Sequence, residues 1–179
     1  MKSEDISRRS FLKRAAALSA AAAIPSFWIP SKANAMPGVP FVSANEKVRI
    51  AFIGIGNRGG EIAQELYKTG LCEVVALCDV DMGAPHTQKL ISMFPKVPRF
   101  QDFRQMFDKM ADKIDAVTVG VPDHAHFPIT IEAMAHGKHV YVEKPMARTF
   151  QEIEVMMRAE KKFGVVTQMG NQGSSWDGT

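Results

Sequence analysis

The sequence contains little cysteine, which argues against a disulfide-stabilised fold. Only two of its 179 residues are cysteines, Cys72 and Cys78. They lie six positions apart in one expected strand, which would separate their Cα atoms by roughly 20 Å, beyond the reach of a disulfide. We therefore expect no internal disulfide, and both residues are best explained as small apolar side chains of a buried strand.

Excess positive charge is absent from most of the chain, although the formal net charge is +3. Residues 1–35 contain six basic and two acidic side chains. The rest of the chain carries 16 of the 22 basic residues and 17 of the 19 acidic ones. The main part of the chain is therefore slightly acidic, and its charge gives no reason to expect nucleic acid as a partner. The composition, with 46% hydrophobic and 23% charged residues, is that of an ordinary globular protein.

The N-terminal apolar run, Ala15–Pro25, is far shorter than the roughly 20 residues needed to cross a bilayer. It follows a basic segment containing Arg8 and Arg9 and precedes Ala33-Asn34-Ala35, a small-residue cleavage pattern. These three parts predict a signal peptide over residues 1–35. It resembles the twin-arginine type, whose translocation machinery carries folded proteins. We expect an exported protein, periplasmic or otherwise extracytoplasmic, with a linker at residues 36–46.

Strands and helices are expected to alternate through residues 47–173, which predicts an α/β fold with a doubly wound parallel sheet. Ligands of such sheets bind at the carboxyl ends of the strands. The expected strands are Val48–Ile53, Glu73–Cys78, Ala116–Val121, His139–Val142 and Val165–Met169, with a weak strand near Val97–Phe100. The expected helices are Asn57–Lys68, Pro85–Phe94, Asp102–Met110, Pro128–His136 and the segment from Thr149 to Phe163, closed by Gly164.

A glycine-rich turn follows the first expected strand and opens the first helix. Gly54 permits a tight turn, Gly56 lets the backbone approach a pyrophosphate, and Gly59 lets helix and strand pack closely. Asp79 ends the second strand twenty residues after Gly59, where an acid binds the adenosine ribose. The pattern predicts a dinucleotide site that also includes Ile55, Asn57 and Arg58 of the same turn.

The acid at position 79 favours NAD over NADP, because a carboxylate accepts hydrogen bonds from ribose hydroxyls and repels a 2′-phosphate. Arg58 weakens this preference, since an arginine in the glycine turn can reach a phosphate. Asp81 stands close by as a second acid. The sequence therefore predicts NAD and leaves NADP open.

Two further strand ends carry polar residues. One has the turn Pro122-Asp123-His124, and the other has Glu143-Lys144-Pro145 after Gly137-Lys138-His139-Val140. Together with the glycine turn, these motifs resemble the Gfo/Idh/MocA family of sugar and inositol dehydrogenases over roughly residues 47–173. The resemblance implies that Lys144 is catalytic beside the nicotinamide and the reacting hydroxyl, that Glu143 contacts the nicotinamide ribose, and that the Lys–Pro bond is often cis.

The remaining candidates are less sharply defined. His124 is a second catalytic candidate near the nicotinamide, with helix capping or polar lining as the alternatives. His124 and His126 lack a third ligand at recognisable spacing, so no metal site is expected. The expected cofactor contacts also include Val121 and Pro122, and Asn171 and Gln172 are candidates for substrate or nicotinamide contact.

These expectations combine into an exported NAD(P)-dependent oxidoreductase that acts on a sugar or polyol. Two alternatives stay open: a glycosidase that works by transient oxidation and elimination, and a noncatalytic NAD-binding module. The family has a second, substrate-binding domain, which we expect to be missing here, with residues 174–179 beginning the linker to it. Homo-oligomerisation is left open.

Overall fold

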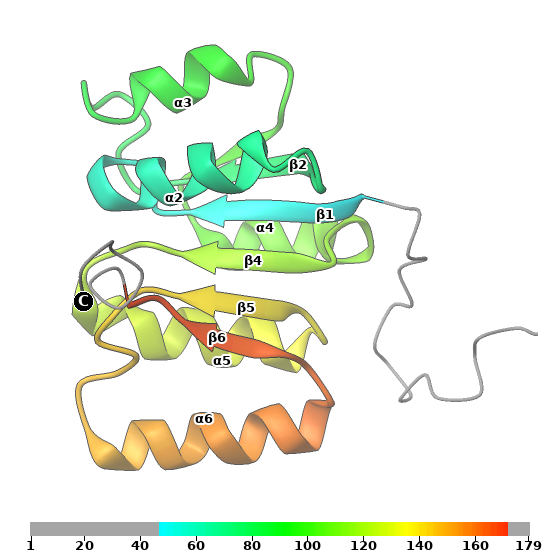
Figure 1. Cartoon of the computed structure of the whole chain (residues 1–179), viewed down its shortest axis with the longest axis vertical. Helices are drawn as coiled ribbons and strands as arrows, with labels where there is room; N and C mark the ends of the chain where they lie inside the picture. Colours follow the sequence, from blue (N-terminus) through cyan, green and yellow to red (C-terminus); the bar gives the residue numbers. More distant parts are fainter. Residues whose placement is uncertain (1–46, 172–179) are drawn as a thin grey trace, which may run out of the picture. The chain divides into compact units, whose positions relative to one another are not determined.

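Six parallel strands form one sheet in the order β3-β2-β1-β4-β5-β6 (Figure 1). This computed structural model describes residues 47–171, so the predicted signal peptide, the linker and Gln172 lie outside the described residues. The strand order is that of a doubly wound nucleotide-binding sheet, as predicted. The strands are β1 (Val48–Ile53), β2 (Cys72–Cys78), β3 (Arg99–Phe100), β4 (Ala116–Val119), β5 (His139–Val142) and β6 (Thr167–Met169).

Helices cover both faces of the sheet. Helices α2 and α3 pack on one face, and α4, α5 and α6 pack on the other (Figure 1). The helices are α2 (Asn57–Lys68), α3 (Gln88–Met93), α4 (Phe103–Met110), α5 (His126–Ala135) and α6 (Phe150–Phe163), with short 3-10 turns η3 (Ala111–Lys113) and η4 (Asp123–Ala125).

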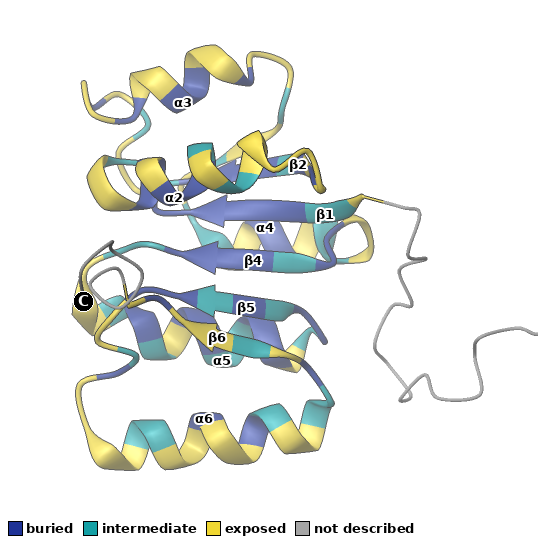
Figure 2. Ribbon diagram, in the orientation of Figure 1, coloured by how far each residue is buried: buried dark blue, intermediate teal, exposed yellow. Residues whose placement is uncertain are grey.

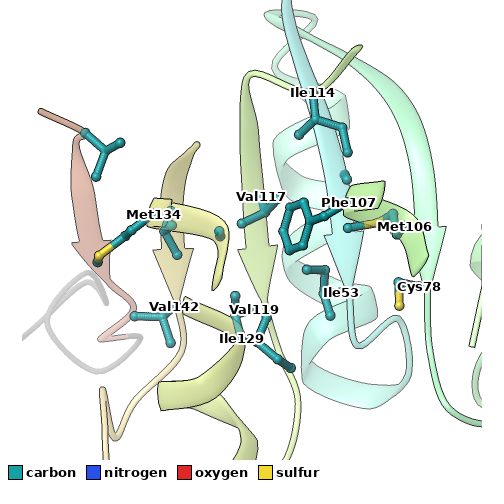
Figure 3. Packing of buried hydrophobic residues seen from close by; sticks show 14 of the residues in the cluster. Ile53, Cys78, Met106, Phe107, Ile114, Val117, Val119, Ile129, Met134 and Val142 are labelled. Carbon is teal, nitrogen blue, oxygen red and sulfur yellow. The ribbon is translucent and has the colours of Figure 1, made fainter. Parts of the chain in front are cut away.

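Strand β1 supplies side chains to the hydrophobic core on both faces, because successive residues of a strand point to opposite sides. Phe52 packs with residues of α2 and α3, whereas Ile53 packs with residues of α4 and α5. The close view in Figure 3 shows Ile53 beside Phe107 of α4 and Val119 of β4. The central strands are therefore almost entirely buried, as Figure 2 shows for β1 and β4.

Several element boundaries differ from the sequence prediction. Helix α3 begins at Gln88 instead of Pro85, because the preceding segment forms a turn in which the Thr87 hydroxyl donates to the Ala84 carbonyl at 2.8 Å. Strand β4 ends at Val119, two residues early, and β6 begins two residues late. Helix α5 begins at His126, so Pro128 lies in its first turn, where its missing N–H is not needed.

The two ends of α6 follow the prediction closely. The Thr149 hydroxyl accepts a hydrogen bond from the Glu152 amide at 3.2 Å, and the Glu152 carboxylate accepts one from the Thr149 amide at 3.1 Å. This reciprocal pair is a capping box. Gly164 ends the helix in the left-handed conformation, with φ of 63°.

An ion pair between the half-exposed Arg49 and the buried Asp115 joins β1 to the segment that leads into β4. Asp115 accepts hydrogen bonds from Nε of Arg49 at 3.0 Å and from Nη2 at 2.6 Å, and also from the Arg49 backbone amide at 2.9 Å. Burial alone raises the pKa of Asp115, but these hydrogen bonds outweigh that effect and hold its pKa below the usual value. The pair lies at the amino ends of the strands, opposite the expected ligand edge.

Candidate functional site

The carboxyl ends of β1 and β4 meet through three glycines. Gly54 has φ of 78°, which favours a residue without a side chain. A Cβ atom on Gly59 would lie 2.8 Å from the Gly120 carbonyl oxygen and would also collide with the Gly54 carbonyl. The start of α2 therefore packs directly against both strand ends, which is the predicted role of Gly59.

The first turn of α2 has the features of an anion-binding site, although the ring of His86 packs against Gly56. Gly56 is the N-cap residue, and no side chain caps the helix. Uncapped amides at a helix N-terminus, together with the positive end of the helix dipole, form a binding site for an anionic group such as a pyrophosphate. Asn57 and Arg58 begin this turn and are exposed, so both are placed where the sequence predicts cofactor contacts.

Asp79 is held in position by two backbone amides. Its Oδ2 accepts a hydrogen bond from Ile55 at 2.9 Å, and its Oδ1 accepts one from Asp81 at 3.0 Å. The carboxylate is thereby fixed beside the glycine turn. Each of its oxygens keeps a further lone pair that can accept a hydroxyl proton.

A cavity of about 660 Å³ extends along this edge of the sheet. It is lined by the glycine turn, by the loop after β2 and by the segment after β4. Asp79, Asp81, Val121, Pro122 and His124 all line it, as predicted from their places at strand ends. The other lining residues are Ile53, Gly54, Gly56, Asn57, Arg58, Cys78, Val80, His86, Gln101, Phe103, Gly120, Ala125 and Ile129.

A second cavity of about 270 Å³ adjoins the first, since both are lined by Arg58, Gly120 and Val121. The second cavity contains the residues that end β5, Glu143 and Lys144, as well as Asp123 and His126. Asp79, the acid that ends β2, therefore lines one cavity, and Lys144, which follows β5, lines the adjoining one.

Arg58 joins the glycine turn to this second cavity. Its Nε donates to Glu143 at 3.2 Å, and its Nη1 donates to Glu61 at 3.0 Å. The hydrogen bond to Glu61, and after it the bond to Glu143, raise the pKa of Arg58 against the opposing effect of burial. One of these two hydrogen bonds thus lies within α2, and the other leads to the end of β5.

Glu143 is buried, with 4% of its surface exposed. The chain after β6 packs over it, because a Cβ atom on Gly170 would lie 2.8 Å from Oε1 of Glu143. The next residue, Lys144, is exposed, and its bond to Pro145 is cis, as the resemblance implied. No side chain among residues 47–171 pairs with the Lys144 ammonium group, which is thus available to a ligand in the second cavity.

His124 and His126 have different surroundings. His124 lies on η4, is exposed and lines the larger cavity. His126 is 1% exposed, and both of its ring nitrogens lie against backbone carbonyls. Within residues 47–171, no three His, Cys, Asp or Glu side chains are grouped so that they could hold a metal ion.

Two site residues escaped the sequence analysis, and a third, His126, was considered there only as a possible metal ligand. Gly120 follows β4 and contacts the glycine turn, His86 packs its ring against Gly56 in the larger cavity, and His126 lines the second cavity. A glycine directly after a buried strand was a usable signal for Gly120. Nothing local distinguishes His86, because its place depends on how the loop after β2 folds back.

His136 and His139, which end an expected helix and begin an expected strand, have structural contacts. His136 is the C-cap residue of α5 and stacks on Phe107, with ring centroids 5.1 Å apart. His139 begins β5, and its Nδ1 accepts a hydrogen bond from the Val166 amide at 2.9 Å. Burial lowers the pKa of His139, which is consistent with a neutral acceptor. Both lie at element ends, as predicted.

The sequence also predicts roles for the two cysteines and for Asn171. Cys72 and Cys78 are free and buried, and burial raises the pKa of Cys78 to about 12. Asn171 is exposed after β6. None of the helices within residues 47–171 has both the length and the apolar character needed to cross a membrane.

The sheet order, the glycine contacts, the uncapped helix N-terminus and the fixed Asp79 define a dinucleotide-binding domain of the Rossmann type. The family model described as "Oxidoreductase family, NAD-binding Rossmann fold" matches residues 48–171. The chain therefore belongs to the Gfo/Idh/MocA family, and its domain is an NAD-binding one.

Three proteins that are similar to this chain extend the comparison. An alpha-N-acetylgalactosaminidase from Shewanella oneidensis is 30% identical over 164 residues, which cover 83% of this chain and 35% of that protein. The crystal structure of a dehydrogenase from Chromobacterium violaceum is 26% identical with a TM-score of 0.64, over 70% of this chain and 36% of that one. The crystal structure of a myo-inositol 2-dehydrogenase from Lactobacillus plantarum is 26% identical with a TM-score of 0.62, over the same shares of the two chains. The present chain thus spans about a third of the length of these proteins.

Proposed function

We propose that the protein is an exported NAD-dependent oxidoreductase that moves a hydride between the hydroxyl-bearing carbon of a sugar or polyol and nicotinamide. The observation that carries the proposal is the position of Lys144, an exposed lysine in a cavity that adjoins the dinucleotide cavity. The similarity to a myo-inositol dehydrogenase and to a galactosaminidase supports a sugar or polyol as substrate.

The residues along the two cavities suggest how NAD lies. The adenosine ribose would bind Asp79, and the pyrophosphate would bind at the glycine turn and the first amides of α2. The nicotinamide end would then reach Glu143 and Lys144 in the second cavity. NAD is favoured over NADP because Asp79 would repel a 2′-phosphate, and because the hydrogen bonds of Arg58 are made to Glu61 and Glu143.

Lys144 would manage the proton of the reacting hydroxyl. Bound nicotinamide supplies the hydride acceptor in this chemistry. When a hydroxyl-bearing carbon is oxidised, its oxygen must lose a proton, and an ammonium group beside that oxygen stabilises the developing negative charge or relays the proton. His124, exposed in the adjoining cavity, is a second candidate for contact with the reacting groups.

A second candidate function is supported by the names of the relatives. A glycosidase of this family type would oxidise the sugar transiently, eliminate the glycosidic substituent and reduce the sugar again, which amounts to hydrolysis. The identity of 30% with an alpha-N-acetylgalactosaminidase favours this possibility. Both functions use the same NAD and the same Lys144, so they differ in product and not in site.

Replacement of Lys144 tests the shared part of both functions. Lys144→Ala should lower turnover by about 100-fold or more, because general acid and base groups contribute that much, while NADH affinity stays close to that of the unchanged protein. Lys161→Ala, on the exposed side of α6, is the matched control and should leave both unchanged. Full activity in Lys144→Ala would remove this lysine from the mechanism.

Product analysis separates the candidates. A nitrophenyl glycoside incubated without added NAD should release nitrophenol and free sugar if the net reaction is hydrolysis. A dehydrogenase that carries its NAD would instead yield an oxidised sugar and would stop after one turnover unless its NADH is reoxidised. Binding of NADH with neither product, across sugars and polyols, would indicate a noncatalytic NAD-binding module.

A further inference from the structure

His126 occupies an unusual position for a buried side chain. It is the first residue of α5 and 1% of its surface is exposed. Its Nδ1 lies 2.6 Å from the carbonyl oxygen of Pro145, and its Nε2 lies 2.8 Å from the carbonyl oxygen of Val121. Both distances are those of hydrogen bonds. One ring thus contacts the loop after β5 and the loop after β4 at once.

The chemistry of these contacts constrains the ring. A backbone carbonyl can only accept a hydrogen bond, and a neutral imidazole carries a single N–H. The ring can therefore donate to either carbonyl, and the tautomer decides which nitrogen donates.

We propose that His126 is a positioning residue whose ring lies between the carbonyls of Val121 and Pro145 and so fixes the loop that carries Lys144. Pro145 directly follows Lys144, so the hydrogen bond to its carbonyl restrains the backbone next to the candidate catalytic side chain. Val121 follows β4, whose end contacts the glycine turn through Gly120. The ring therefore sets the place of Lys144 relative to the expected cofactor site.

The ring contacts can be tested in the unchanged protein. In a ¹⁵N-labelled sample of the full chain, nuclear magnetic resonance should show a ring N–H of His126 that exchanges slowly with water, because the ring is 1% exposed and lies against two carbonyls. The exposed ring of His124 should show fast exchange and serves as an internal comparison. Equally fast exchange at His126 and His124 would overturn the proposal, whatever the variants show.

The positioning role can be tested through two ligands that differ at one end. This test rests on the proposed function, in which nicotinamide lies beside Lys144. ADP-ribose lacks the nicotinamide ring, whereas NADH contains it. His126→Phe, which keeps a ring but has no donor, should weaken NADH binding by about three- to tenfold relative to ADP-ribose. His126→Gln, which keeps an N–H donor, should recover part of that loss.

His136→Phe is the matched control, because it places the same substitution at the other end of α5, outside both cavities. It should leave the ratio of the two affinities unchanged. Equal weakening of both ligands by His126→Phe, or no weakening, would overturn the positioning role. If the unchanged chain fails to bind ADP-ribose, the proposed cofactor site is wrong, and the exchange rate of the His126 ring N–H still tests the contacts of that ring.

Discussion

Gly59 has no room for a side chain, because the carbonyls of Gly54 and Gly120 face its α-carbon. Gly59→Ala should therefore destabilise the fold by about 1–3 kcal/mol, as overpacking of a close contact does. It should also weaken NADH binding more than tenfold, since α2 would move away from the strand ends. Thermal unfolding and fluorescence titration with NADH would measure the two effects.

Gly83→Ala is the matched control for this prediction. A Cβ atom at Gly83 would meet only Oδ1 of Asp81 at 3.5 Å, an ordinary van der Waals distance. Its stability and NADH affinity should stay close to those of the unchanged protein. If Gly59→Ala behaves in the same way, the packing of α2 against the strand ends does not determine the site.

Residues whose roles depend on local chain geometry could be predicted from the sequence. Gly54 makes the expected tight turn, with φ of 78°, and Asp79 lies beside the glycine turn, because a strand, a turn and a helix fix both positions. A glycine directly after a strand was a usable signal for Gly120, but the contacts of Gly120 and His126 could not be assigned in this way. Their contacts join segments far apart in the chain, and only the packing of β4 and β5 beside β1 brings those segments together.

At the scale of elements, Arg49 and Asp115 join β1 to the start of β4. Arg49→Met should lower the free energy of unfolding at pH 7 by about 1–3 kcal/mol. This is less than the loss of a fully buried pair, since Arg49 reaches solvent. Because the pKa of folded Asp115 is lowered, its contribution is complete above the pKa of the unfolded chain and disappears as the pH falls through the folded pKa.

The difference between Arg49→Met and the unchanged protein should therefore shrink as the pH is lowered from 7 toward 3. Urea unfolding at several pH values measures it. Lys68→Met is the control, since Lys68 pairs with Glu65 on an exposed surface of α2. That variant should change stability little at any of these pH values. A difference for Arg49→Met that stays constant with pH would contradict the role given to Asp115.

Element types followed from hydrophobic periodicity and end signals, whereas some boundaries did not. The capping box of α6 and the end of α2 at Lys68 were predictable, because each depends on neighbouring residues. The late start of α3 was not, since side-chain bonds from Thr87 and Gln88 to preceding carbonyls hold the segment before it in a turn. The early end of β4 follows from the approach of Gly120 to α2.

At the scale of the whole molecule, export and the cofactor are linked in our proposal. The space outside the cytoplasm is not expected to hold free NAD, so an exported protein of this kind should carry its cofactor. Protein purified from that compartment should release nicotinamide dinucleotide on denaturation, measured by absorbance. It should also unfold at a higher temperature than protein stripped of the cofactor, by mass action. Release of no nicotinamide would contradict the carried cofactor.

The contact between Gly59 and Gly120 also has a consequence for the order of events during synthesis. A nascent chain that has emerged only through β2 contains the glycine turn and Asp79, yet lacks the strand end against which α2 packs. It also lacks Lys144, more than twenty residues further along the chain than Gly120. High-affinity capture of the dinucleotide therefore awaits emergence of the central strands from the ribosome. A chain that holds its cofactor has by then brought β1, β2, β4 and β5 together.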